Sequence, residues 1–236
     1  KAAGYDNLGT FEFLVDASDM ETFAFIEANP RLQVEHTVTE EITGVDLVQA
    51  QLRIAGGATL SRLGLTQHEI PNPRGYAIQL RVNMETMDAE GNARPAGGVL
   101  SAFEPPSGPG VRVDTFGYAG YRTSPSFDSL LAKLIIHSRS PDFVDAVRRA
   151  ARALSEFRIE GVATNIPFLR NLLAQKAFAT NEITTRYIET HAAELAATPG
   201  DDAQRFFASA VSGGVVAQAT HVKGPENSLP VGAPMQ

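Results

Sequence analysis

The sequence IEANPRLQVE at residues 26–35 alternates strictly between apolar and polar side chains. In an extended chain, alternate side chains point to opposite sides, so one side of this segment is entirely polar. Its polar side chains are Glu27, Asn29, Arg31, Gln33 and Glu35. Carboxylates, amides and a guanidinium together suit the metal-assisted binding and reaction of a small anion. The guanidinium can bind the anion through two N–H groups, the amides donate further hydrogen bonds, and a carboxylate can act as a base. A solvated edge strand also alternates, and Pro30 favours that interpretation.

The segment before this stretch predicts a β-hairpin. Residues 9–15 (GTFEFLV) and 22–28 (TFAFIEA) are rich in aromatic and β-branched side chains, and a polar connector separates them. If the turn is centred near Asp19 and Met20, Glu12 and Glu27 lie directly opposite, with Cβ atoms roughly 5 Å apart. Such a pair is destabilising unless a proton or a cation lies between the carboxylates, and ligands that are all oxygen suit Mg²⁺ or Mn²⁺. In the alternative, the register is shifted by one residue and the glutamates point to solvent on different faces.

The strand patterns and helix patterns of the remaining chain predict a mixed α+β fold. An extended stretch is expected over residues 29–38, and strict alternation predicts a strand over residues 76–82. Further short strands are expected at residues 98–103, 111–114 and 130–137.

Helices are predicted from capping residues and apolar spacing. Asp46 and Gln49 form a capping pattern for a helix over about residues 46–55. Ser140 and Pro141 supply the N-cap and first residue of another helix. Two more helices are expected, one starting near Asn165 and one over residues 183–196.

Composition excludes several classes of protein. The 236 residues are 43% hydrophobic and 20% charged, which favours one large or two modest globular domains. The absence of cysteine excludes a disulfide scaffold, a thiolate zinc site and a cysteine nucleophile. A net charge of −7 disfavours nucleic-acid or anionic-membrane binding, and no apolar run approaches the roughly 18 residues that span a bilayer. We expect a cytoplasmic protein and, because the chain starts at Lys1, a piece of a longer polypeptide.

Four segments carry a family resemblance. They are residues 9–15, 25–57 (FIEANPRLQVEH onward), 80–83 (LRVN) and 117–135 (GYAGYRTSPSFDSLLAKLI). Together they resemble the second half of biotin carboxylase, an ATP-grasp domain of biotin-dependent carboxylases, over residues 1 to about 195. The string Glu-x-Asn-Pro-Arg-x-Gln-Val-Glu-His is highly specific. Carbamoyl-phosphate synthetases share its first half and are the weaker match.

The resemblance implies a site for ATP and bicarbonate. By it, Glu12 and Glu27 hold divalent metals that bridge the ATP phosphates, and Asn29 belongs to the same phosphate and metal shell. The bicarbonate cradle comprises Arg31, Gln33 and the backbone of Val34. Glu35 is the base that removes the bicarbonate proton, so that attack on the γ-phosphate gives carboxyphosphate.

The resemblance also implies a biotin pocket. Arg81 is the second arginine that, with Arg31, stabilises the enolate-like oxygen of biotin. Asp128 matches an acidic residue near the biotin pocket, and Arg112 matches an arginine of the dimer interface. The sequence Asn-Met-Glu-Thr at residues 83–86 departs from the Asn-Ala-Glu-Asp usual in the family, which puts the pocket floor beside Arg81 in doubt.

The same resemblance divides the chain into three parts. Residues 1–70 match the C-terminal part of the ATP-grasp domain, residues 71–197 match the biotin carboxylase C-terminal domain, and residues 198–236 form a linker with a possible short helix near 203–208. Residues 230–236 resemble the first strand of a biotinyl carrier domain, as in single-chain acyl-CoA carboxylases. The implied partners are that carrier, a carboxyltransferase domain and a second copy of the chain.

The family's ATP-grasp lid, adenine site and ATP-binding lysines match nothing in this sequence, so we expect the chain alone to be inactive. Two other interpretations stay open. The chain can act as a non-catalytic dimerisation or docking fragment, or as part of an ATP-grasp ligase of another substrate class. The final acyl acceptor is not encoded in these residues.

Overall fold

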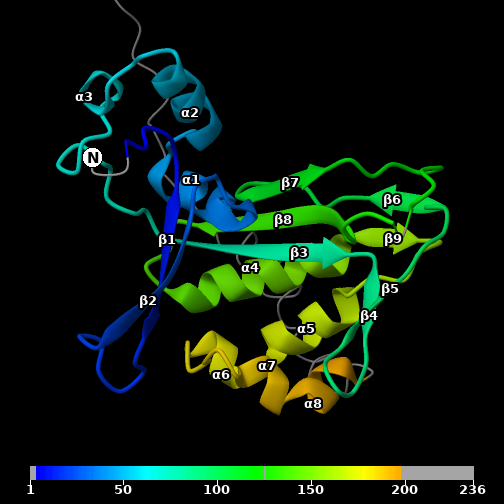
Figure 1. Ribbon diagram of the computed structural model, residues 1–236. Coiled ribbons are helices and arrows are strands. Elements are labelled where there is room, and N and C mark those ends of the chain that lie inside the picture. The colour runs from blue at the N-terminus through cyan, green and yellow to red at the C-terminus, as the bar shows by residue number, and fades with distance from the viewer. Residues whose placement is uncertain (1–3, 125, 198–236) are drawn as a thin grey trace, which may run out of the picture.

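Residues 4–124 and 126–197 are described by a computed structural model, whose centre is an antiparallel three-stranded sheet (Figure 1). The sheet has the order β3 (Tyr76–Asn83), β8 (Leu130–Ser138) and β7 (Val111–Thr115). Helices α4 (Phe143–Glu156) and α5 (Ile166–Ala174) cover one face, and α1 (Thr37–Thr43) packs on the other. The mixed α+β prediction is therefore confirmed.

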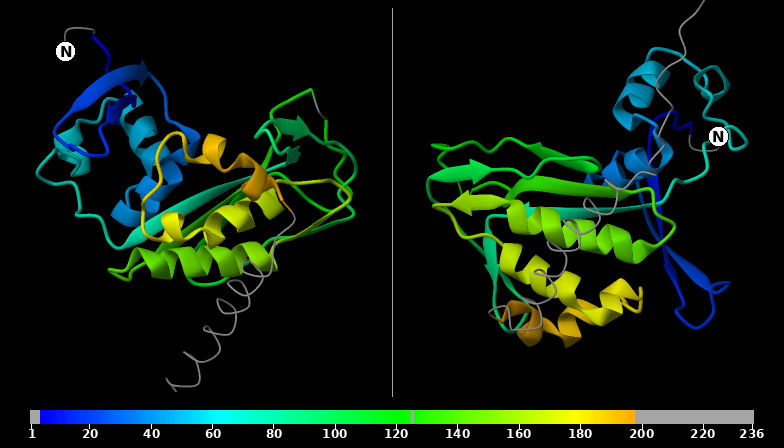
Figure 2. Two further views of the ribbon diagram at one scale, coloured as in Figure 1. Left: turned by 90° about the horizontal axis from the view of Figure 1, so that it is seen from below. Right: turned by 180° about the vertical axis from the view of Figure 1, so that it is seen from behind.

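The core lies between this sheet and helix α4, as Figure 2 shows from below and behind. Alternate residues of β3 and β8 point to α4, whose buried stripe is rich in alanine and lets the helix approach the sheet closely. The central contacts are made by Ile78, Leu80, Val82, Leu134, Ile136, Ala146, Val147, Ala150, Ala151 and Leu154. Because the side chains alternate, Gln79 and Arg81 lie on the opposite face of β3, the face that carries α1.

Strands β1 (Thr10–Val15) and β2 (Phe23–Asn29) form the predicted hairpin, which projects away from the rest of the molecule (Figure 1). Glu12 and Glu27 are direct partners, so the predicted register is confirmed at this pair. Beyond Glu12, towards the turn, the register shifts by one residue, and Phe13 pairs with Phe25.

The expected extended stretch over residues 29–38 is wrong beyond Asn29. The chain leaves β2 at Pro30, which cannot donate a ladder hydrogen bond, and the backbone N–H of Arg31 turns back to the Asn29 carbonyl at 2.8 Å. A 3₁₀ turn, η1 (Val34–His36), then leads directly into α1. The alternation at residues 26–35 therefore does not continue as one strand.

Helix α2 (Leu47–Ala55) confirms the helix predicted at residues 46–55, and the Asp46 side chain accepts a hydrogen bond from the Gln49 N–H as expected. Helix α1 was not predicted. It ends at Gly44, whose φ of 74° is the left-handed conformation that favours glycine. The other short elements around the sheet are α3 (Leu60–Leu63), β4 (Glu85–Met87), β5 (Ala93–Pro95), β6 (Ala102–Glu104), β9 (Arg158–Glu160) and α6 (Lys176–Ala179).

Two helix predictions in the C-terminal part need correction. The N-cap of α4 is Asp142, whose carboxylate accepts from the Val144 N–H at 2.9 Å, whereas Ser140 accepts from the N–H of Asp142 and Pro141 precedes the helix. The helix expected over residues 183–196 is two short ones, α7 (Tyr187–Thr190) and α8 (Ala192–Ala196), separated at His191.

Some expectations lie outside the described residues, namely the linker at 198–236 with its short helix and the carrier-like residues 230–236. Across the described ranges, no helix combines the length and apolar character that a bilayer crossing requires.

Candidate functional site

Four residues of the hairpin and the following loop form one hydrogen-bonded group, here called the carboxylate-amide cluster: Glu12, Glu27, Asn29 and Gln33. The side-chain nitrogen of Asn29 donates to Glu12 Oε1 at 2.9 Å and to Glu27 Oε1 at 2.8 Å. Gln33 donates a further hydrogen bond to Glu12 Oε1 at 2.6 Å. The amide of Asn29 thus lies between two opposed carboxylates, and the four predicted residues are brought together.

The cluster has the chemistry of a hard-cation site. Its groups are carboxylates and amides, and Mg²⁺ typically binds one or two carboxylates and completes its shell with waters or substrate phosphates. Among the described residues, no group of three or more His, Cys, Asp or Glu side chains is arranged to hold a metal. A divalent metal held by the two carboxylates of the cluster would leave coordination positions for waters or substrate phosphates. In this structure Asn29 presents its nitrogen to the carboxylates, and it would have to present its oxygen to coordinate a cation.

The other predicted residues of the segment lie around the 3₁₀ turn. Arg31 is exposed, and its guanidinium donates to the Leu32 carbonyl at 3.4 Å. Glu35 is exposed within η1, and Val34 is half-buried. Because η1 replaces a strand here, Glu35 is placed by the turn and by helix α1 rather than by a pleated strand.

Arg81 and Asp128 form a second group. Arg81 lies on the polar face of β3, and its guanidinium is 3.9 Å from the Asp128 carboxylate. Their side chains are 46% and 72% exposed, so this ion pair contributes little to stability and leaves both groups accessible to a ligand. The loop that carries Asp128 is fixed by the next residue, because Ser129 donates to Glu85 Oε2 at 2.7 Å.

Sequence reasoning missed a contact between helix α1, which follows η1, and strand β3, which carries Arg81. Thr37, the first residue of α1, donates a hydrogen bond from its hydroxyl to Gln79 Oε1 on β3. Gln79 shares a face of β3 with Arg81, as expected for a strand over residues 76–82, but no periodicity marked Thr37, because α1 itself was not predicted. His36, which precedes it, contacts Thr10 and Thr39 through its two ring nitrogens at 3.1 and 3.2 Å, so it has a structural role.

Arg112 is placed away from the carboxylate-amide cluster. Its guanidinium contacts Glu40 of α1 at 2.8 Å and Asp114 of β7 at 2.9 Å, while Lys133 contacts Asp114 at 3.1 Å. Hydrogen bonds to Asp114 and Glu40 raise the pKa of Arg112 above its usual value despite burial. Burial acts to raise the pKa of Asp114, but hydrogen bonds from Arg112 and Lys133 outweigh it and hold that pKa below its usual range.

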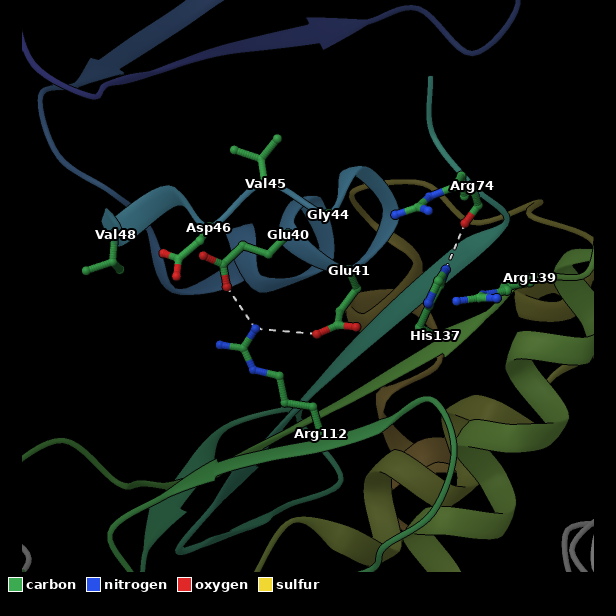
Figure 3. A pocket seen from close by; sticks show the side chains of 10 residues that line it. All are labelled: Glu40, Glu41, Gly44, Val45, Asp46, Val48, Arg74, Arg112, His137 and Arg139. Atoms are coloured by element: carbon green, nitrogen blue, oxygen red, sulfur yellow. Dashed lines mark hydrogen bonds and ion pairs between the residues drawn. The ribbon is translucent and has the colours of Figure 1, made fainter. Parts of the chain in front are cut away.

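A cavity of about 690 Å³ lies beside this ion-pair network (Figure 3). Arg74, His137 and Arg139 line one side of it, and Glu40 and Arg112 line another. None of the residues predicted to bind metal, bicarbonate or biotin lines this cavity. The predicted site residues therefore lie outside the lining of this cavity.

Two family models match the chain. Residues 79–190 match the biotin carboxylase C-terminal domain. Residues 1–63 match the ATP-binding domain of the carbamoyl-phosphate synthase L chain.

Curated relatives are much longer than the chain. Pyruvate carboxylase from Aspergillus niger is 44% identical over 225 residues, which is 95% of this chain and 18% of that protein. Biotin carboxylase 1 from Bacillus subtilis is 42% identical over 191 residues, which is 81% of this chain and 40% of that protein. The chain therefore spans well under half the length of these relatives.

Solved structures share the fold. A single-chain, multi-domain long-chain acyl-CoA carboxylase is 50% identical with a TM-score of 0.76, covering 84% of this chain and 21% of that one. The biotin carboxylase domain dimer of Hydrogenobacter thermophilus 2-oxoglutarate carboxylase, in complex with MgADP, ADP and bicarbonate, is 40% identical with a TM-score of 0.71. That match covers 81% of this chain and 40% of that one.

Proposed function

The chain belongs to the biotin carboxylase family, and from that membership we propose that it supplies the metal, bicarbonate and biotin side of an ATP-dependent biotin carboxylase site. The reaction is the carboxylation of carrier-bound biotin, at the expense of ATP and bicarbonate. The single observation that carries the proposal is the opposed pair Glu12 and Glu27, joined by Asn29 and Gln33 into one cluster.

In this proposal the carboxylate-amide cluster is the metal side of the nucleotide site. Glu12 and Glu27 hold Mg²⁺ or Mn²⁺, which neutralises the charge of the ATP phosphates when bound. Asn29 turns its amide oxygen towards the metal and phosphate shell. The metal, in place of the amide N–H groups, then offsets the repulsion between the opposed carboxylates.

Glu35 and its neighbours handle bicarbonate. Gln33, the backbone of Val34 and the guanidinium of Arg31 orient the anion, and Glu35 takes its proton. A bicarbonate oxygen attacks the γ-phosphorus, the bond from that phosphorus to the β-bridging oxygen breaks, and ADP leaves. The exposure of Arg31 and Glu35 leaves both side chains accessible to substrate.

Arg81 acts on biotin. Carboxyphosphate breaks down to CO₂ and phosphate, the phosphate deprotonates the ureido nitrogen of biotin, and that nitrogen attacks CO₂. Arg81 and Arg31 place fixed positive charge beside the ureido oxygen, where negative charge develops. Asp128, 3.9 Å from Arg81, orients the guanidinium at the edge of the biotin pocket.

In this proposal, the parts of the enzyme that these residues do not include belong to a longer protein. We propose the division already given, with residues 1–70 in the ATP-grasp domain, 71–197 in the C-terminal domain and 198–236 as a linker. A biotinyl carrier domain and a carboxyltransferase domain are the partners, and a second copy contacts the surface near Arg112. The similarity to a single-chain, multi-domain long-chain acyl-CoA carboxylase supports a place for these residues in a longer, multi-domain protein.

The test uses the longer carboxylase polypeptide that carries these residues. We expect it to cleave ATP only with Mg²⁺ and bicarbonate, and to carboxylate free biotin. Arg81→Gln should lower the biotin carboxylation rate by roughly 10²-fold to 10³-fold, since one transition-state donor is lost. Arg94→Gln is the matched control, because Arg94 is also a strand arginine paired with an aspartate, Asp88, at 2.9 Å.

Two results would contradict the proposal. ATP cleavage that ignores bicarbonate and biotin would indicate a ligase of another substrate class. Absence of Mg·ATP binding, measured by isothermal titration of the longer polypeptide, would leave only a docking or dimerisation role.

A further inference from the structure

The two parts of the proposed site come from different elements. The carboxylate-amide cluster and Glu35 belong to the hairpin and to η1, whereas Arg81 belongs to β3 of the central sheet. A bicarbonate base and a biotin-binding arginine must keep a fixed separation, since small displacements of reacting groups are costly for rate. Some contact must therefore hold η1 against β3.

A side-chain hydrogen bond at this junction runs from Thr37 to Gln79. Thr37 is 7% exposed, and it follows Glu35 by two residues, with its own N–H donating to the Glu35 carbonyl. Gln79 precedes Arg81 by two residues and therefore lies on the same face of β3. One side-chain hydrogen bond thus connects Thr37, whose backbone is bonded to that of Glu35, with Gln79, which shares a face of β3 with Arg81.

Further contacts hold the C-terminal end of α1. Arg112 of β7 contacts Glu40, and the Arg74 N–H donates to the Ile42 carbonyl at 2.9 Å. Since this end is fixed independently, and His36 still contacts Thr10 and Thr39, losing the bond between Thr37 and Gln79 should shift the N-terminal end of α1 without detaching the helix. The effect should fall on Glu35 and its turn.

We propose that Thr37 and Gln79 are positioning residues that set the separation between Glu35 and Arg81. The proposal rests on the proposed function, in which Glu35 is the base and Arg81 the biotin-binding arginine. Neither Thr37 nor Gln79 touches substrate in it. Both act through their neighbours in the chain.

The test again uses the longer carboxylase polypeptide. Thr37→Val keeps the shape of the side chain and removes the hydroxyl, and Thr37→Ser keeps the hydroxyl. Thr123→Val is the matched control, because Thr123 is also 7% exposed and its hydroxyl is also hydrogen-bonded, to the backbone of Gly98. Both valine variants should lose thermal stability, because Thr37→Val gives up one hydrogen bond of a buried hydroxyl and Thr123→Val gives up two.

Kinetics separate positioning from stability. We expect Thr37→Val to lower kcat/KM for bicarbonate about tenfold or more, with the KM for Mg·ATP unchanged. Thr37→Ser should restore the rate, and Thr123→Val should not lower it. Gln79→Met removes the acceptor while keeping side-chain length, and the double variant with Thr37→Val should lose no more rate than either single variant.

The outcomes are distinguishable. Equal kinetics for Thr37→Val and Thr123→Val, or additive losses in the double variant, would overturn the positioning role alone. An unmodified protein without bicarbonate-dependent ATP cleavage would overturn the proposed function and this inference with it. If Thr37→Val does not fold, Gln79→Met compared with Thr37→Ser gives the same decision.

Discussion

Glu12 and Glu27 face each other with only an amide group between them, and this is an electrostatically unfavourable arrangement. Opposed like charges destabilise a strand pair by up to about 1 kcal/mol. The N–H groups of Asn29 and Gln33 offset part of that cost. A divalent cation offsets more, because it carries full opposite charge.

The repulsion between Glu12 and Glu27 predicts that Glu27→Gln affects amide hydrogen exchange in the hairpin differently with and without a divalent metal. Without divalent metal, Glu27→Gln should slow amide hydrogen exchange in β1 and β2, because repulsion is relieved while a hydrogen-bond acceptor remains. Added Mg²⁺ should slow exchange in the unmodified protein and have little effect in the variant. Glu21→Gln, an exposed change of the same charge in the hairpin turn, is the control. Faster exchange in metal-free Glu27→Gln would contradict the prediction.

At the same scale, residues differ in how predictable they are. The pairing of Glu12 with Glu27 was predicted from the turn position, but the sequence left a register shifted by one residue open, and the structure excludes that alternative at this pair. The contact between Thr37 and Gln79 joins residues 42 positions apart, on a helix and a strand whose docking has no local signal. Side-chain pairs of this kind are set by tertiary packing, which single-sequence patterns do not report.

Among the elements, regular patterns were predictable and turns were not. Strand β3 and helix α2 follow their alternation and capping residues. The alternation at residues 26–35 was misleading, because Pro30 ends the strand and a 3₁₀ turn follows. The polar residues still gather near one another, since Gln33 reaches back to Glu12 from the loop.

The start of α4 gives a test of the corrected cap. Asp142→Ala should lower the free energy of unfolding by about 1 kcal/mol, because the Val144 N–H loses its acceptor. Ser140→Ala should cost less, since Ser140 accepts only from the N–H of the cap residue itself. Urea unfolding of both variants decides between them. A larger loss of unfolding free energy for Ser140→Ala than for Asp142→Ala would instead support Ser140 as the N-cap.

The docking of α1 on the sheet should depend on pH. The pKa of Asp114 is lowered in the folded protein, so its stabilising contribution is complete above the unfolded pKa of about 3.9 and is lost as the pH falls through the lower folded value. Asp114→Asn should therefore destabilise the protein at neutral pH, and the difference should shrink towards about pH 3. Urea unfolding across this range measures it, with the exposed Asp6→Asn as control. A difference that grows on acidification would contradict the assignment.

For the whole molecule, we propose that the described residues supply one side of a catalytic site, and a buried core holds the central sheet and helix α4 together. The carboxylate-amide cluster supplies two carboxylates and two amides. The expected lid, adenine site and ATP-binding lysines match nothing in this sequence, and the relatives are much longer than this chain. The 236-residue chain alone should therefore release no phosphate from Mg·ATP in response to bicarbonate and biotin. Bicarbonate-stimulated release above a protein-free blank would contradict this.

The hairpin has one more consequence at this scale. Phe11, Phe23 and Phe25 are 67%, 64% and 57% exposed, and among the strands of the described residues β1 and β2 pair only with each other. A two-stranded ribbon with exposed apolar side chains and two unpaired backbone edges can pair with a strand of another polypeptide. At high concentration the isolated chain should self-associate through this ribbon, and charged substitutions on its aromatic side chains should keep it dispersed.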